Sequence, residues 1–483
     1  MRPWLILTLL LSLSTAPATL AADDPPAAQR PRIGLVLSGG GARGAAHIGV
    51  LAVLEELRIP VDAIAGTSMG AIVGGLYASG MSPDEMQAAI AAIDWRSVFD
   101  DAPPRQDRSF RRKEDQYDPL FALELGWTGR RMLLPSGLIA GQKLDIILRE
   151  LVLNTYDITD FDRLPVRYRA VAADLADGQA VVLRRGDLVQ AMRASMAIPG
   201  AFTPVDLDGH QLVDGGMAKN LPVDVVRGMG VDIVIAVDIG TPVGMLDGSE
   251  SLLGVVRRTL DVLSKANVGE QKKLLTDRDL LLEPDLGTIE TASFDRLGEA
   301  VAVGRRAAEA RAADLSRFSV SEAEYAALRA CQRRPRLADP MVDRIVVGGN
   351  RRVPARMIER RMTTQAGRPL DLGRLRRDLT DIYRVGEFAR VDARLTRADS
   401  SNTLEIDARR SPGARATCAS GCCCRAISTA RANSTSWPTT GSASSTAWAP
   451  NGARSAASAA PWGCGRTSTS RWSTRDSGSS IRR

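Results

Sequence analysis

The sequence has very few of the side chains that most often carry metal and redox chemistry. Among its 483 residues are two histidines and six cysteines, and five of the cysteines lie beyond residue 417. Cys331 is the single cysteine of the main body, where it has no partner for an internal disulfide. Because no His-x-x-His and no pair of nearby cysteines occurs before residue 418, we expect no metal site and no cofactor.

Strong net charge is also absent from most of the chain. Residues 413–483 contain nine arginines, no lysine and one acid, which gives this segment a formal charge of +8 and leaves −1 of the total of +7 for the rest. A nearly neutral main body gives no support to a polyanionic partner, so we expect no nucleic acid to bind it.

Apolar runs long enough to span a bilayer as a helix are missing too. One apolar stretch stands near the start, where Arg2 precedes residues 4–13 and small residues follow up to Ala22. This pattern is typical of a secretory signal peptide over residues 1–22, and its apolar part is too short for a transmembrane helix. We therefore expect the mature protein to leave the cytoplasm.

Residues 412–483 contain no Leu, Val, Phe, Tyr or Met, whereas four of the seven tryptophans occur there. Such a composition cannot bury enough apolar surface to fold, which predicts a non-globular tail. One interpretation is a disordered basic tail. The other is a shifted reading frame, because the codons for residues 417–424, moved by one nucleotide, can spell a sequence with the alternation of a β-strand. We assign this tail no function.

The rest of the chain has the pattern of an α/β protein. Strand-like apolar runs alternate with helical segments from residue 33 to about 320, which predicts a three-layer α/β domain around a central, mostly parallel sheet. Residues 321–340 are expected to form a linker. A small unit with the element order β-α-α-β-β is predicted over residues 341–411.

The first of two consecutive strand–turn–helix units contains a glycine-rich loop. An apolar run over residues 33–37 enters the loop and leaves as a helix, an arrangement that aims backbone N–H groups at an anion. We expect the loop to hold a developing oxyanion; its candidate residues are Gly39, Gly40, Gly41, Arg43 and Gly44. Arg43 is either a charged supplement to this site or a brace for the loop.

The same glycine spacing matches a dinucleotide-binding fingerprint, with Asp62 as the downstream acid. Asp62, however, lies at the start of the next strand rather than at its end, where a ribose would need it. A dinucleotide site also leaves the following turn unexplained. We therefore favour the oxyanion interpretation of the loop.

The second unit carries the candidate nucleophile. An apolar run over residues 61–65 is followed by Gly66-Thr67-Ser68-Met69-Gly70 and a helix. Gly-x-Ser-x-Gly between a strand and a helix is typical of a nucleophile elbow, in which Gly66 and Gly70 permit the sharp turn that presents Ser68. The alternative is a serine that only caps a helix.

A nucleophilic serine needs a base, and the chain offers two histidines. His47 lies one turn into the first helix, where we expect it to be packed. His210 lies four residues before Asp214, so in an extended strand it would be more than ~13 Å from that carboxylate. A Ser–His–Asp triad is therefore poorly supported.

We favour a Ser–Asp dyad with Asp214 as the base, because the two glycines that follow it, Gly215 and Gly216, allow a close turn. Three other aspartates lie near predicted strand ends, where capping or turn formation is the expected role: Asp174, Asp177 and Asp238.

Four motifs together resemble the patatin-like phospholipase family. They are the Gly39–Gly44 loop, the Gly66–Gly70 elbow, the run over residues 194–200 and Asp214-Gly215-Gly216, in the family's order. The resemblance covers residues 33 to about 225. It implies a three-layer sandwich and a serine acyl-ester hydrolase, a phospholipase A that degrades glycerophospholipids. It also implies that Ser68 is the nucleophile, Asp214 the base and the glycine loop the oxyanion hole.

Residues 343–409 resemble a POTRA domain, on the motifs at residues 347–350 and 382–388. A patatin-like domain followed by POTRA is similar to the bacterial patatin-like autotransporters of the PlpD type, which continue into an outer-membrane β-barrel. We expect this barrel to be missing here or lost by a frameshift, since the composition changes where it would start. The resemblance implies a place in the outer membrane or outside the cell, or in the periplasm without the barrel.

The implied partners are a phospholipid or membrane-surface substrate, a second copy of the chain as one option, and an outer-membrane barrel or passenger segment for the POTRA-like unit. The alternative from another class is a non-catalytic secreted interaction protein that uses the POTRA-like unit for strand addition.

Overall fold

The computed structural model describes residues 30–99, 126–127, 132–133, 137–240, 252–333, 340–349, 353–384, 388–398 and 400–410. All of them belong to one unit of the chain. The predicted signal peptide and the predicted tail lie outside the described residues. No helix in the described part of the chain combines the length and the hydrophobicity that a membrane-spanning helix needs.

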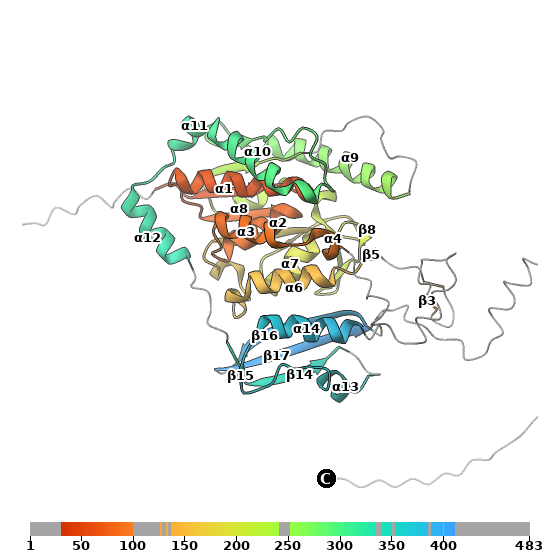
Figure 1. Ribbon diagram of the computed structural model, residues 1–483. Coiled ribbons are helices and arrows are strands. Elements are labelled where there is room, and N and C mark those ends of the chain that lie inside the picture. Colours follow the sequence, from red (N-terminus) through yellow and green to blue (C-terminus); the bar gives the residue numbers. More distant parts are fainter. Residues whose placement is uncertain are drawn as a thin grey trace, which may run out of the picture. The chain divides into compact units, whose positions relative to one another are not determined.

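An eight-stranded sheet forms the centre of the larger part of the molecule (Figure 1). Four ladders are parallel and join, in order, β12 (Leu280–Leu282), β11 (Ile233–Val237), β1 (Ile33–Leu37), β2 (Ala63–Thr67) and β6 (Arg167–Asp174). The remaining ladders are antiparallel and add β7 (Ala180–Leu183), β10 (His210–Asp214) and β9 (Val205–Leu207). The mostly parallel central sheet predicted from the sequence is confirmed.

Both faces of the sheet are covered, because alternate residues of the strands β1, β2 and β11 enter different cores. Leu35 and Leu37 of β1 belong to the larger core. It includes residues of helices α1 (Ala46–Glu56), α2 (Met69–Ala78), α3 (Pro83–Ala92), α6 (Gln142–Leu151), α7 (Leu188–Ser195) and α10 (Leu297–Glu309). Val36 belongs to a separate core with residues of α8 (Val223–Gly228) and α9 (Leu252–Lys272). The result is the predicted three-layer arrangement.

Shorter elements complete this part. They are the helices α4 (Trp95–Val98), α11 (Ala312–Ser316) and α12 (Glu322–Gln332), and the short strands β3 (Gly126–Trp127), β4 (Met132–Leu133), β5 (Gly137–Ile139) and β8 (Gly200–Phe202).

Residues 340–410, called the small unit below, have a core and a sheet of their own. In its three-stranded sheet, β17 (Ser401–Arg410) lies between β14 (Arg344–Gly348), which is parallel to it, and β16 (Phe388–Ala398), which is antiparallel. The helices are α13 (Ala355–Glu359) and α14 (Leu372–Arg384), and the short strands β13 (Met341–Val342) and β15 (Arg368–Pro369) pair with each other. The predicted β-α-α-β-β order is present, with this short pair added.

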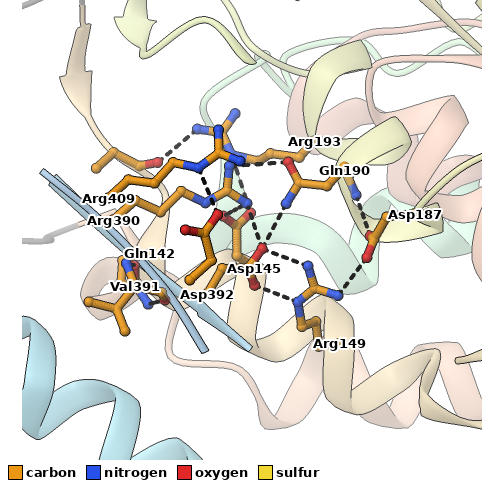
Figure 2. Close-up of polar contacts among 12 residues, drawn as sticks. Gln142, Asp145, Arg149, Asp187, Gln190, Arg193, Arg390, Val391, Asp392 and Arg409 are labelled. Atoms are coloured by element: carbon orange, nitrogen blue, oxygen red, sulfur yellow. Dashed lines mark hydrogen bonds and ion pairs between the residues drawn. The ribbon is translucent and has the colours of Figure 1, made fainter. Parts of the chain in front are cut away.

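A buried network of charges joins α6 and α7 to β16 of the small unit (Figure 2). Arg149 of α6 pairs with Asp187, the residue before α7, and with Asp392 of β16, at N–O distances of 2.9 and 2.6 Å. Burial alone would raise the pKa of Asp187, but Arg149 and Arg394 hold that pKa at about 2. Asp187 is therefore ionised at every physiological pH.

A second buried carboxylate lies in the same network. Asp145 of α6 stands between Arg193 of α7 and Arg390 of β16, at 3.4 and 2.8 Å. Beside it, the Gln142 side chain accepts a hydrogen bond from the N–H of Val391 at 2.8 Å. Because the charges are removed from water, each one is tolerated only while its partner is present.

This arrangement predicts a large loss of stability for Asp145→Ala. The substitution leaves the buried Arg193 and the partly buried Arg390 without that carboxylate, and we expect the free energy of unfolding to fall by about 3–5 kcal/mol. The control is Glu270→Ala, whose partner Lys273 lies with it on the surface and whose loss should cost less than about 1 kcal/mol. Urea unfolding of both variants measures the difference, and equal losses would contradict the prediction.

Candidate active site

The turn between β2 and α2 gives Ser68 an unusual backbone. Its φ and ψ angles are 54° and −123°, a region that L side chains rarely adopt. The turn is tight because a Cβ at Gly66 would lie 2.4 Å from the carbonyl oxygen of Gly70. A Cβ at Gly70 would lie 2.3 Å from the carbonyl oxygen of Leu37. Both predicted elbow glycines are thus required by close approach of the backbone.

Asp214 lies at the end of β10, the strand antiparallel to β6. The structure brings its carboxylate to Ser68, whose Oγ donates a hydrogen bond to Asp214 Oδ2 at 2.7 Å. The other carboxylate oxygen accepts the N–H of Gly216 at 2.7 Å. A Cβ at Gly215 would lie 2.1 Å from the carbonyl oxygen of Val171, so the Asp-Gly-Gly turn packs directly on β6.

Burial sets the protonation behaviour of Asp214. Desolvation raises the pKa of its carboxyl to about 6, against the opposing effect of the hydrogen bonds from Ser68 and Gly216. At pH 7 the carboxylate is mostly ionised, yet it is far more basic than an ordinary aspartate. These are the properties of a group that accepts a proton and later returns it.

Three residues of the glycine loop, Gly39 to Gly41, line a cavity of about 450 Å³ that Ser68 and Asp214 also line. The N–H of Gly39 donates to Asn220 Oδ1 at 3.1 Å. For the N–H groups of Gly40 and Gly41, no acceptor occurs within the residues that the structure describes. These two N–H groups are therefore available to a ligand in the cavity.

The other two predicted loop residues have supporting positions. The Arg43 guanidinium donates to the carbonyl oxygens of Ile239, Gly240 and Ile289, at 3.0, 2.6 and 2.8 Å. It braces the loop, and these contacts do not fit the alternative of a charge aimed at an oxyanion. Gly44 is absent from the cavity lining. A Cβ there would lie 2.2 Å from Cγ of Met69, so Gly44 permits close packing.

The structure does not join either histidine to the Ser68–Asp214 pair. His210 Nδ1 lies 2.6 Å from Asp174 Oδ2, and its ring is half exposed. His47 is buried, which lowers its pKa to about 4, and its Nε2 lies 2.8 Å from the carbonyl oxygen of Ser38.

The other three aspartates have the expected turn-forming bonds. Asp174, Asp177 and Asp238 accept backbone N–H groups two residues on. Across the described residues, no group of three or more His, Cys, Asp or Glu is placed to hold a metal ion.

Sequence reasoning missed two residues next to the pair. Asn220 bridges the N–H and carbonyl groups of Gly39, and nothing in its sequence neighbourhood indicates this role. Ser195 accepts the N–H of Ser68 through its hydroxyl at 2.9 Å. Ser195 belongs to the run over residues 194–200, one of the four motifs of the family resemblance. The sequence therefore marked this segment but did not indicate what Ser195 does.

Residues 35–227 match the family model described as patatin-like phospholipase, so this part of the chain is a patatin-like phospholipase domain. The α/β patatin-like fold expected from the resemblance is confirmed. The matched region includes both Ser68 and Asp214. It ends before the small unit, whose likeness to POTRA remains a prediction, as do export and the autotransporter architecture.

Two curated relatives illustrate the extent of the similarity. A patatin-like phospholipase domain-containing protein of Caenorhabditis elegans is 35% identical over 227 residues, which are 46% of this chain and 15% of that protein. An uncharacterized NTE family protein of Mycobacterium tuberculosis is 35% identical over 225 residues, 46% of this chain and 51% of that protein. The chain spans about half or less of these relatives.

Solved structures show weaker global similarity. VipD from Legionella pneumophila gives a TM-score of 0.35 at 15% identity, covering 59% of this chain and 67% of that one. ExoU in complex with SpcU, from the type III secretion system of Pseudomonas aeruginosa, gives 0.31 at 19% identity, covering 61% and 54%. The assignment of the fold therefore rests on the family match and the order of the sheet.

The raised pKa of Asp214 predicts that Asp214→Asn stabilises the protein at neutral pH. The folded state binds this proton more tightly than the unfolded chain, so stability is full below about pH 4 and is lost as pH rises through about 6. A neutral amide avoids that loss, and we expect a gain on the order of 3 kcal/mol at pH 7.

Urea unfolding at pH 4 and pH 7 measures this effect, with Asp277→Asn at an exposed position as the control. The gain should be present at pH 7 and nearly absent at pH 4. A loss of stability at pH 7 would contradict the assigned environment of Asp214.

Proposed function

We propose that the patatin-like phospholipase domain cleaves the acyl ester bonds of glycerophospholipids through a Ser68–Asp214 dyad. The observation that carries this proposal is the hydrogen bond from Ser68 Oγ to a buried carboxylate of raised pKa. The family match supports the substrate class. A serine beside a group that can accept its proton is the minimum that nucleophilic acyl transfer requires.

Each step of the proposed reaction is given to a residue of the site. Asp214 Oδ2 takes the proton of Ser68 Oγ while that oxygen attacks the acyl carbonyl carbon. The carbonyl oxygen becomes negative and accepts hydrogen bonds from the N–H groups of Gly40 and Gly41. Collapse of this intermediate breaks the ester C–O bond, and Asp214 returns the proton to the departing alcohol. Water, deprotonated in turn by Asp214, then attacks the acyl carbon. The bond from that carbon to Ser68 Oγ breaks, Asp214 returns the proton to Oγ, and the fatty acid leaves.

We further propose that the chain is exported and that the small unit is POTRA-like and contacts an outer-membrane barrel or a passenger segment. Within the described residues, β14 pairs with β17 alone and leaves its other edge open, with Val346 exposed. An open edge of this kind suits the addition of a strand. The same open edge also fits the competing interpretation, a non-catalytic binding protein. An activity assay distinguishes the two interpretations.

The test of the dyad is fatty-acid release from phosphatidylcholine and phosphatidylglycerol vesicles by the full chain. Ser68→Ala and Asp214→Asn should each lose at least roughly 10³-fold in kcat because each removes a reacting group. His210→Gln should retain activity, since His210 pairs with Asp174. In the unmodified protein, kcat/KM should fall below pH 6 as Asp214 becomes protonated. Loss of activity in His210→Gln alone would favour a triad.

Gly39→Ala tests the oxyanion loop. The added Cβ would lie 2.6 Å from Asn220 Oδ1 and 2.9 Å from Cβ of Ser68, so the loop must move away from the nucleophile. We expect kcat to fall by roughly 10²- to 10³-fold, as when an oxyanion donor is removed. Gly298→Ala is the matched control, because nothing lies within 4 Å of its added Cβ. Similar kcat values for the two variants would place the oxyanion elsewhere.

A further inference from the structure

The segment that begins with the last residue of α7 contacts the backbone of both members of the dyad. The Ser195 hydroxyl accepts the N–H of Ser68 at 2.9 Å and donates to the carbonyl oxygen of Val171 at 2.5 Å. Two residues on, the carbonyl oxygen of Ala197 accepts the N–H of Asp214 at 2.9 Å. One short segment therefore fixes the main chain of the nucleophile and of its base.

The Ser195 hydroxyl continues a sheet ladder at the point where the chain turns away. The parallel pairing of β2 with β6 ends with Thr67 opposite Val171. Ser68 comes next, and its N–H bonds to the Ser195 hydroxyl, while its positive φ turns the following chain away from the ladder. The Ser195 hydroxyl bonds to both that N–H and the Val171 carbonyl oxygen, so each of these buried groups has a partner.

We propose that Ser195 is a positioning residue, whose hydroxyl holds Ser68 in the backbone conformation that directs Oγ to Asp214. The proposal rests on the proposed function, because it assigns Ser195 a part in the same reaction. Ser195 is fully buried and touches only the backbone of Ser68 and β6 in these two bonds. Its effect on catalysis passes through the orientation of the nucleophile and not through contact with substrate.

The helix that carries Ser195 is itself held along its length (Figure 2). Asp187 caps its first turn by accepting the N–H of Gln190, and pairs with Arg149. Near the other end, Arg193 pairs with Asp145 and stacks over the ring of Phe202, with 4.6 Å from Cζ to the ring centre. Because α7 is held near both ends, the Ser195 hydroxyl has little freedom to move away from Ser68.

Ser79 supplies a matched control. Like Ser195, it is fully buried and its hydroxyl donates to a backbone carbonyl oxygen, that of Leu76, at 2.7 Å. Unlike Ser195, it has no bond to Ser68. A purely structural hydroxyl should therefore behave like Ser79, and a positioning hydroxyl should not.

The experiment measures p-nitrophenyl butyrate hydrolysis by the full chain, with rates expressed per site titrated by a fluorophosphonate. In Ser195→Ala, kcat should fall roughly 10- to 100-fold with KM within about twofold, because misorientation acts on the reacting geometry. Ser195→Thr keeps a hydroxyl and should restore most of kcat, and Ser79→Ala should keep it within about twofold. Equal kcat in the two alanine variants, or a change in KM alone, would overturn the proposal.

Amide hydrogen exchange over residues 63–69 gives a readout that needs no turnover. The Ser68 amide should exchange faster in Ser195→Ala than in Ser79→Ala, and unchanged exchange would overturn the proposal even in an active enzyme. Should Ser195→Ala unfold at the assay temperature, Ser195→Cys replaces it, since a thiol is a weak acceptor. An unmodified protein that hydrolyses neither this ester nor phospholipids would instead reject the proposed function, and the exchange result would still test the role of Ser195.

Discussion

The backbone of Ser68 is the constraint to which the surrounding structure is fitted. A non-glycine residue at this φ and ψ stores on the order of 1–3 kcal/mol and persists only where its neighbours enforce it. Glycines on both sides let the strand, the helix and the preceding loop approach within distances that no side chain allows. The Ser68 N–H then donates to the Ser195 hydroxyl. The strained turn places Ser68 in the lining of the cavity at the carboxyl edge of the parallel sheet, where the glycine loop also begins.

Two buried aspartates show how the environment gives a structural carboxylate and the proposed base different pKa values. Asp187 and Asp214 both lie out of water, which raises the pKa of either group. Two arginines reverse this effect at Asp187, whereas in the described parts of the molecule Asp214 has hydrogen bonds but no basic partner. The first is fixed as an anion that holds elements together, and the second keeps a basicity suited to proton transfer.

The sequence predicts those parts of the site that are formed by short motifs of neighbouring residues. Ser68 and the three cavity-lining glycines each stand in a short turn between an apolar strand and a helix, and Asp214 stands before two glycines. Such patterns follow from backbone geometry alone. The partners that complete the site are distant in the chain: Asn220 lies 181 residues from Gly39, and Ser195 lies 127 residues from Ser68. Asn220 has no local pattern that indicates its contact, and the run over residues 194–200 marks Ser195 without indicating its partner. Arg43 had two equally suitable roles, which its three carbonyl partners distinguish.

The charge network between α6, α7 and β16 constrains how this protein can change over generations. Asp145 pairs with both Arg193 and Arg390, so replacing Asp145 removes a partner of two cations at once, whereas replacing either arginine leaves the carboxylate with the other. A substitution of Asp145 is therefore accommodated only when both arginines change with it. Because α7 also ends on the serine that accepts the N–H of Ser68, the helix that carries part of this charge network also supports the turn between β2 and α2, so a change in the small unit can reach Ser68 through α7.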